Sequence, residues 1–208
     1  MTSEPRIAVE IWSDYVCPFC YLELPAVERL KEEFGPRVDV SWHAFELRPE
    51  PAPTLDPDGE YLHDIWGRSV YPMAEERGMR LRLPPVQPRS RKAFEAVAHA
   101  KTLGLFDRMH DALFRGFFEH GKDIGNTETL LEIAASIGMD PAALKEALDT
   151  ERYTQQVLED EQRAYDLGIT GVPLTLVRRA DRPLAESMAL SGAVPYEKLR
   201  AAADRAAG

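Results

Sequence analysis

The sequence predicts an α/β fold, and three observations support that class. Residues 6–12 and 38–45 are short runs rich in β-branched residues, and an amphipathic segment lies between them. Helical periodicity then dominates from residue 60 to residue 165. Strand-like runs return at residue 172 and are followed by a final helix-like segment. The expected order is strand, helix, strand, a block of helices, then strand, strand, helix.

The segment between the first two strands is predicted to be a helix. Apolar residues recur every four positions from Leu22 to Phe34, which places them on one helical face. Gly35 and the proline after it end the pattern. Pro25 lies inside it and predicts a kink, because proline removes a backbone donor. A strand–helix–strand unit of this kind is typical of an α/β sheet.

The middle of the chain is predicted to be helical after a loop. Residues 48–60 are rich in proline and aspartate, which favours a loop. Residues 105–118 then carry leucine, methionine and phenylalanine along one stripe, which we interpret as hydrophobic core.

The end of the chain completes the arrangement. Two strands are predicted over 172–179 and 183–192, with a turn near Asp181, and the last helix over 195–207. Without the helical block, the order β-α-β…β-β-α is that of the thioredoxin fold. We therefore expect a thioredoxin fold with a large all-helical insertion between its second and third strands. The corresponding domains are an N-terminal half (1–59), a helical insertion (60–165) and a C-terminal half (166–208).

Composition excludes several classes of partner. The 208 residues include 25 Lys and Arg against 35 Asp and Glu, a formal charge of −10. Nucleic acid and anionic membranes need a basic face, so neither is an expected partner. The sequence shows no secretory leader pattern and no apolar run of ~18–20 residues, so we expect a cytoplasmic protein. Structural disulfides are rare in that compartment.

The two cysteines of the chain, Cys17 and Cys20, lie where the first strand gives way to the helix. A spacing of three brings their Cα atoms within the ~4.4–6.8 Å that a disulfide requires. Cys17 is expected at the start of the helix, where the dipole and free N–H groups stabilise a thiolate. Cys20, one turn further, is expected to be more buried and able to attack a mixed disulfide on Cys17. Pro18 suits the first turn of the helix, because the backbone N–H that proline lacks would have no intrahelical partner there.

The pair has two other interpretations, a metal site and two inert core residues. A zinc site needs four ligands, and the five histidines show no ligand spacing, so no metal is expected. Two inert core cysteines would not account for a position between a strand and a helix. A redox pair is the favoured interpretation.

Glu10 is a further candidate, because a carboxylate in the middle of a central strand is unusual. It is expected beneath Cys20, where it would take the proton of that thiol during exchange. The alternative is a glutamate that faces outward or lies at the edge of the sheet.

Two stretches carry a family resemblance. "IWSDYVCPFCYLE" and "LGITGVPLTLV" resemble the DsbA-like thioredoxin-fold oxidoreductases. "WHAFELRPE", "FDRMHDALFRGFFEHGKDIGNTETLLEIA" and "DEQRAYDLGITGVP" are similar to the FrnE-like branch of predicted dithiol–disulfide isomerases. The resemblance extends over roughly residues 6 to 205.

The resemblance implies roles for individual residues. Cys17 matches the nucleophile, Cys20 the resolving cysteine, and Pro173 the proline held in cis opposite them. A cis turn exposes the backbone of Val172 to an extended substrate. An ordinary trans proline at a strand start is the alternative. The residues expected to contact substrate are Pro18, Phe19, Gly171, Val172 and Tyr15.

The expected function is thiol–disulfide exchange on protein or small-molecule disulfides. No cofactor is expected beyond the Cys17–Cys20 pair. A reducing or oxidising partner is expected to reset that pair, and glutathione could serve as this partner. The chain is expected to act as a monomer or homodimer. At the position of Phe19, this branch often carries tryptophan, and the strongly oxidising periplasmic members carry histidine. Because Phe19 offers no donor to the thiolate, we expect a pair that is only moderately oxidising.

Two alternatives to this function stay open. Glutathione-dependent isomerases and transferases of the chromene-carboxylate isomerase and kappa type share the insertion, but they carry a serine at the position of Cys17. A client-binding module without catalysis is the other alternative. Its cleft would be lined by Tyr15, Phe19, Tyr61 and Trp66.

Overall fold

The computed structural model describes residues 6–208, and its elements follow the predicted order. The first unit is β1 (Ile7–Ser13), α1 (Pro18–Phe34), a 3₁₀ turn η1 (Gly35–Arg37) and β2 (Val38–Ala44). The helices that follow are α2 (Glu60–Ile65), the π-helical η2 (Trp66–Val70), α3 (Tyr71–Glu76), α4 (Arg91–Thr102), α5 (Phe106–Phe118), α6 (Thr127–Ser136), α7 (Pro141–Asp149) and α8 (Thr154–Asp166). The chain ends with β3 (Leu174–Arg179), the 3₁₀ turn η3 (Leu184–Glu186), β4 (Met188–Ser191) and α9 (Tyr196–Ala207).

The four strands form one mixed sheet in the order β2-β1-β3-β4. β1 is parallel to β2 and antiparallel to β3, and β4 is antiparallel to β3. This is the thioredoxin arrangement, with α2–α8 between the second and third strands, and it confirms the predicted fold class.

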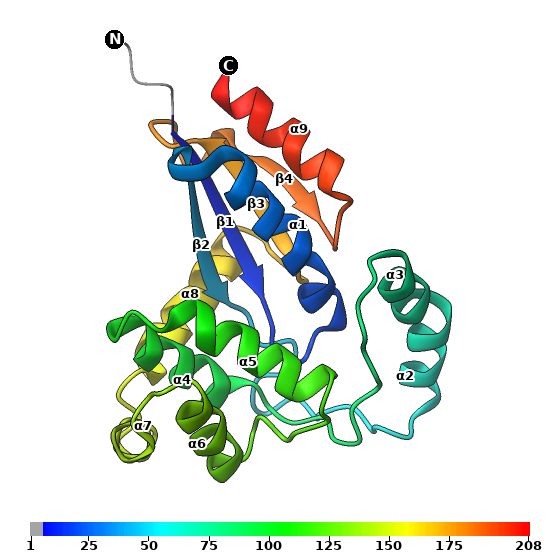
Figure 1. Ribbon diagram of the computed structural model, residues 1–208, viewed down its shortest axis with the longest axis vertical. Helices are drawn as coiled ribbons and strands as arrows, with labels where there is room; N and C mark the ends of the chain where they lie inside the picture. The colour runs from blue at the N-terminus through cyan, green and yellow to red at the C-terminus, as the bar shows by residue number, and fades with distance from the viewer. Residues whose placement is uncertain (1–5) are drawn as a thin grey trace.

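The two faces of the sheet are covered by different helices (Figure 1). Ile7, Val9 and Ile11 of β1 pack with Val27 of α1 and Leu199 of α9 in one cluster. Residues at alternate positions of a strand point to the opposite face. Trp12 accordingly packs with Ala164 and Ile169, which lie in α8 and just after it.

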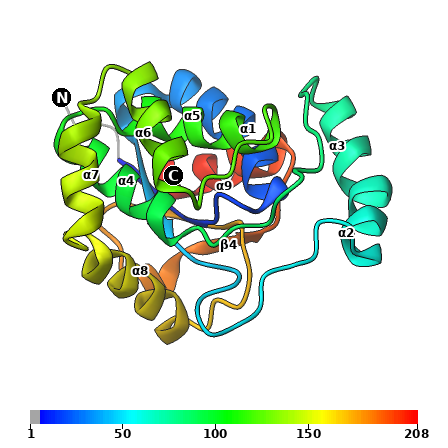
Figure 2. The same ribbon diagram turned by 90° about the horizontal axis from the view of Figure 1, so that it is seen from below.

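Helices α4–α7 lie at the end of the sheet where β1 finishes and α1 begins, as Figure 1 shows. The apolar stripe of α5 is core, as predicted: Met109, Leu113, Phe114 and Phe117 have no exposed surface. Helices α2 and α3 stand to one side of this block (Figure 2). The residues before α1 therefore lie between the sheet and the inserted helices.

Two predicted stretches differ from the structure. The run 183–192 forms a strand only over Met188–Ser191, because turn hydrogen bonds from Glu186 and Ser187 close η3 first. Residues 77–90, inside the predicted helical block, are not helical, and the three prolines between positions 84 and 88 remove backbone donors there. Across residues 6–208, no helix combines the length and apolar character that crossing a bilayer requires.

Candidate functional site

Cys17 is the N-cap of α1. Its backbone is extended, with φ −93° and ψ 114°, and Pro18 is the first helical residue. The N–H of Cys17 donates to the carbonyl of Asp14 at 3.1 Å, and its own carbonyl accepts from the N–H of Cys20 at 3.1 Å. No side chain caps this helix end. The sulfur of Cys17 is therefore the side-chain group that the sequence places at the positive end of the α1 dipole.

Cys20 lies one turn further along α1 and is fully buried, whereas Cys17 keeps 4% of its surface exposed. Both are free thiols. The N–H of Asp14 donates to the sulfur of Cys20 at 3.4 Å. Burial, and then contact with Cys17, raises the pKa of Cys20 well above the ordinary thiol value, while the Ser13 hydroxyl and the Asp14 N–H lower it. An approaching molecule meets Cys17 first.

The turn before β3 closes the site from the other half of the fold. The peptide bond between Val172 and Pro173 is cis. The thiol of Cys17 donates to the carbonyl oxygen of Val172 at 3.6 Å, and the carbonyl of Pro173 accepts from the N–H of Gly192 at 2.8 Å. The structure thus brings Cys17 and Val172 into contact. Three further expected contact residues, Pro18, Phe19 and Gly171, are half-buried beside them in the chain.

Glu10 does not lie where the sequence analysis placed it. The odd-numbered residues of β1 pack with α1, so Glu10 points to the opposite face, toward α8. There its carboxylate accepts from Arg163 at 2.6 Å and Arg178 at 2.8 Å, and lies 3.4 Å from His43 Nε2. The sheet separates Glu10 from Cys20, and the expectation of a carboxylate from β1 beneath Cys20 is wrong.

Tyr15 is likewise buried, although it lines a small cavity of about 150 Å³ together with Trp42 and His110. Only 3% of its surface is exposed, and its hydroxyl is hydrogen-bonded to His110 Nδ1 at 2.8 Å. Its ring packs on Phe94 and Phe114. Of the other aromatic residues expected in a cleft, Trp66 is also buried, while 64% of the surface of Tyr61 is exposed.

Asp14 was missed in the sequence, although it shapes the loop that carries both thiols. Its carboxylate accepts from the N–H of Leu47 at 2.7 Å and the N–H of Val16 at 3.2 Å, and it has no exposed surface. Burial raises its pKa to about 6, and the hydrogen bonds from Leu47, Ser90 and Val16 oppose that rise. An aspartate between a buried strand and a helix start is the signal that could have identified it.

Glu23 was also missed. It lies three residues beyond Cys20, has no exposed surface, and accepts from the Thr175 hydroxyl at 2.9 Å. Burial raises its pKa to about 7, and the Thr175 hydroxyl and the charge of Arg77 oppose that rise. The sequence signal that could have identified Glu23 is its helical spacing from Cys20 and Val27, which places an acid in a segment interpreted as an apolar face.

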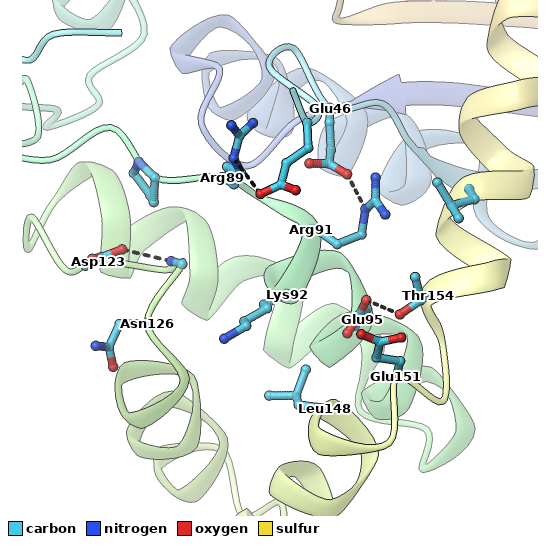
Figure 3. Close-up of a pocket in the computed structure, with 14 residues that line it drawn as sticks. Glu46, Arg89, Arg91, Lys92, Glu95, Asp123, Asn126, Leu148, Glu151 and Thr154 are labelled. Carbon is cyan, nitrogen blue, oxygen red and sulfur yellow. Dashed lines mark hydrogen bonds and ion pairs between the residues drawn. The ribbon is translucent and has the colours of Figure 1, made fainter. Parts of the chain in front are cut away.

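A cavity of about 790 Å³ is lined by none of the cysteine-site residues. It lies among α4, α6, α7 and α8, and Figure 3 shows Glu46 and Arg91 on one side with Asn126 and Leu148 across from them. Its cations are already engaged: Arg91 pairs with Glu46, Arg89 lies 3.3 Å from Glu50, and Lys92 donates to a threonine hydroxyl at 3.0 Å. These opposed charges assign no ligand class. Within residues 6–208, no three His, Cys, Asp or Glu side chains converge as a metal would require.

The comparisons with known proteins agree with this geometry. The family model of the DSBA-like thioredoxin domain matches residues 8–204. The uncharacterized protein YwbO of Bacillus subtilis (strain 168) is 34% identical over 175 residues, which cover 82% of this chain and 86% of YwbO. The crystal structure of the probable DsbA oxidoreductase SCO1869 from Streptomyces coelicolor has a TM-score of 0.78 at 28% identity, covering 97% of this chain and 90% of that one.

A more distant structure shows the same fold. The cytosolic disulfide reductase DsbM from Pseudomonas aeruginosa, solved with GSH, has a TM-score of 0.66 at 20% identity, covering 88% of this chain and 89% of that one. With a family model that spans almost all of its residues, this chain belongs to the DsbA-like thioredoxin family of thiol oxidoreductases.

Proposed function

We propose that this protein catalyses thiol–disulfide exchange through Cys17 and Cys20, acting on protein or small-molecule disulfides. The observation that carries the proposal is the placement of the two sulfurs. One is the N-cap of α1 with 4% of its surface exposed, and the other is fully buried one turn behind it. A nucleophile must be reachable and stabilised as a thiolate, and a resolving thiol must wait behind it.

The proposed reaction has two steps. The thiolate of Cys17 attacks one sulfur of the client disulfide, a mixed disulfide forms, and the other client sulfur leaves as a thiolate. Cys20 then loses its proton and attacks Cys17, so that the Cys17–Cys20 disulfide forms and the client is released reduced. The reverse sequence oxidises a client dithiol.

Val172 supports the binding of an extended client next to Cys17. Its carbonyl lies 3.6 Å from the sulfur of Cys17, in a half-buried turn that precedes β3. A client strand that pairs with this backbone would hold its disulfide beside the nucleophile.

We propose that the protein works mainly as a reductase or isomerase in the cytoplasm. Phe19 supplies no N–H or charge to the thiolate of Cys17, so the reduced form gains no hydrogen bond from it. The family neighbour DsbM is described as a cytosolic disulfide reductase and was solved with GSH. Glutathione is accordingly the proposed partner that resets the pair.

The test is a trapping experiment with matched variants. The Cys20→Ala variant is expected to accumulate mixed disulfides with clients, because nothing resolves the bond on Cys17. The Cys17→Ala variant, which keeps Cys20, is expected to trap none. Mass spectrometry after release with dithiothreitol identifies the clients, and equal trapping by both variants would refute the assignment of the nucleophile.

A variant with both cysteines replaced distinguishes the alternative activity from thiol–disulfide exchange. A glutathione-dependent isomerase or transferase of this fold would not need two thiols, so a variant with both cysteines changed to serine would keep its activity. We expect that variant to lose exchange with insulin or glutathione disulfide and to accelerate no conjugation. Retained conjugation would favour the alternative.

A further inference from the structure

The face of α1 that packs on the sheet contains one acid. Cys20, Val27 and Leu30 lie on this face and have no exposed surface. Glu23 lies between Cys20 and Val27 at helical spacing and is equally buried. A carboxyl in an apolar interface costs stability unless its oxygens are satisfied. Such a group next to a reactive centre is a candidate for function.

The partners of Glu23 do not form a structural ion pair. Its Oε1 accepts from the Thr175 hydroxyl at 2.9 Å, and its buried Oε2 has no hydrogen-bond partner among residues 6–208. The guanidinium of Arg77 donates instead to the carbonyls of Leu22 and Ala193, at 2.5 Å and 2.7 Å. Arg77 acts on Glu23 only through its charge. The Oε2 atom of Glu23 therefore remains available to accept a proton.

The sheet places Glu23 and Cys20 against neighbouring rows of one face. The Ser13 hydroxyl lowers the pKa of the Cys20 thiol, and Glu23 is bonded to Thr175, whose strand partner is Ile11. Ser13 and Ile11 share one face of β1, so the two rows lie about 6–7 Å apart. A helical side chain leans toward the helix N-terminus, which brings the Glu23 carboxylate toward Cys20.

The hydroxyl of Ser13 stands beside the thiol at the start of this short path. Ser13 is buried, and its Oγ makes no hydrogen bond to any nitrogen or oxygen of residues 6–208. Two buried oxygens without such partners, Ser13 Oγ and Glu23 Oε2, thus lie in adjacent rows on the same face.

We infer that Glu23 receives the proton of Cys20 when Cys20 resolves the mixed disulfide, and returns it when the Cys17–Cys20 disulfide is reduced. The inference rests on the proposed exchange reaction. In the resolving step the S–H bond of Cys20 breaks and the Glu23 carboxylate becomes a carboxylic acid. The Cys20–Cys17 bond forms, the Cys17–client bond breaks, and the client sulfur leaves as a thiolate that takes a proton from water. The Ser13 hydroxyl favours the thiolate of Cys20 in this step, because it lowers the pKa of that thiol.

The surroundings of Glu23 agree with this role. The groups that face it from the sheet, Thr175 and Ile11, carry no charge, and the charged group acting on it is Arg77. Its raised pKa, about 7, lets the carboxyl both accept and release a proton near neutral pH.

Stopped-flow reaction of the reduced protein with 5,5′-dithiobis(2-nitrobenzoate) tests the inference. Attack by Cys17 releases one thionitrobenzoate, and resolution by Cys20 releases the second. We expect Glu23→Gln to keep the first phase within about twofold of wild type and to slow the second at pH 7 by about tenfold or more. The second phase of wild type is expected to rise with pH through an inflection near 7 that Glu23→Gln lacks. Glu23→Asp is expected to restore part of the rate.

Glu10→Gln is the matched control, since Glu10 lies on the opposite face of the same sheet, and it is expected to leave both phases unchanged. Equal slowing of both phases in Glu23→Gln, or a slower second phase with an unchanged pH profile, would indicate a structural role and overturn the inference. A second phase of wild type without the inflection overturns it without any variant. Loss of the first phase in wild type would instead refute the proposed exchange reaction.

Discussion

The sulfur of Cys17 lies 3.6 Å from the carbonyl oxygen of Val172, although 155 positions separate the two residues in the sequence. Cys17 begins the helix that follows β1, and Val172 ends the segment that leads into β3. β1 and β3 are antiparallel neighbours, so the end of one strand and the start of the other meet at the same edge of the sheet. The site is therefore built by the thioredoxin halves, and the inserted helices lie beyond it.

Phe19 is predicted to limit the oxidising power of the pair. Phe19→His places a donor beside the thiolate of Cys17, and a hydrogen bond there favours the reduced form. We expect the equilibrium with reduced and oxidised glutathione to shift toward the dithiol by about tenfold, since about 1.4 kcal/mol corresponds to that factor. Phe19→Leu is the control and is expected to leave the equilibrium in place. An unchanged equilibrium in Phe19→His would show that this position does not tune the pair.

Glu10 is predicted to matter for stability and not for exchange. Its carboxylate is buried among Arg163, Arg178 and His43, and Glu10→Gln leaves the two arginines without that counter-charge. We expect the free energy of unfolding in urea to fall by about 1–3 kcal/mol. The rates of the two exchange phases are expected to stay at wild-type values. If Glu10→Gln had unchanged stability and a slower second phase, Glu10 would take part in the exchange reaction.

Glu10 was predicted to lie beneath Cys20 and does not, whereas Glu23 was not predicted and lies on the same helix face as Cys20. The two residues show what the sequence could predict and what it could not. The strand pattern located β1 correctly, and the Cys-x-x-Cys spacing located the start of α1. Both faces of β1 are buried, however, so the alternation of Ile7, Val9 and Ile11 does not say which face α1 covers. The face toward α1 decides whether a carboxylate can reach Cys20, and it is set by packing with α8 and α9, far along the chain.

The helix face of α1 posed a similar difficulty. The spacing from Leu22 to Phe34 predicted one apolar stripe, and the structure buries a wider face that also includes Cys20 and Glu23. An acid at the margin of an apolar stripe is usually solvated, so periodicity gives no reason to expect it inside. Most of the inserted helices and β3 depended on local signals and were predicted, whereas the strand predicted over 183–192 is shortened to Met188–Ser191 by η3.

His110 is predicted to make stability fall on acidification. Burial, and then the charge of Lys31, lowers its pKa from 6.5 to about 3, and it stays neutral beside the Tyr15 hydroxyl. The unfolded chain binds a proton below pH 6.5 that the folded chain does not, so stability from this group is present above 6.5 and is lost below it. Relative to His110→Leu, wild type is expected to lose about 2 kcal/mol between pH 7 and pH 5.

The measurement is urea unfolding of both proteins at the two pH values. Phe106→Leu serves as the control, because the ring of Phe106 stacks on His110 at 5.2 Å and carries no titratable group. Its stability difference from wild type is expected to be the same at both pH values. A constant difference between wild type and His110→Leu would show that His110 titrates normally in the folded protein.

Asp14 is predicted to make stability fall as pH rises, which is opposite to the effect of His110. Burial raises its pKa from 3.8 to about 6, so the folded chain holds a proton that the unfolded chain has released between these values. Stability from this group is therefore present at low pH and falls as pH rises toward 6. Asp14→Asn has one oxygen for the N–H groups of Val16 and Leu47, and we expect it to be less stable by about 1–3 kcal/mol at pH 4.5.

Between pH 4.5 and pH 7.5 that difference is expected to shrink by about 2 kcal/mol, because only the wild type loses stability through ionisation. Asn126→Ala is the control, since it removes a side-chain bond to the Thr129 N–H but no titratable group. Its difference from wild type is expected to be constant over the same range. Because the backbone of Asp14 also bonds to Cys17 and Cys20, a second readout is the rate at which Cys17 attacks 5,5′-dithiobis(2-nitrobenzoate). A stability difference that grows with pH would contradict the assignment of a buried, protonated carboxyl at this position.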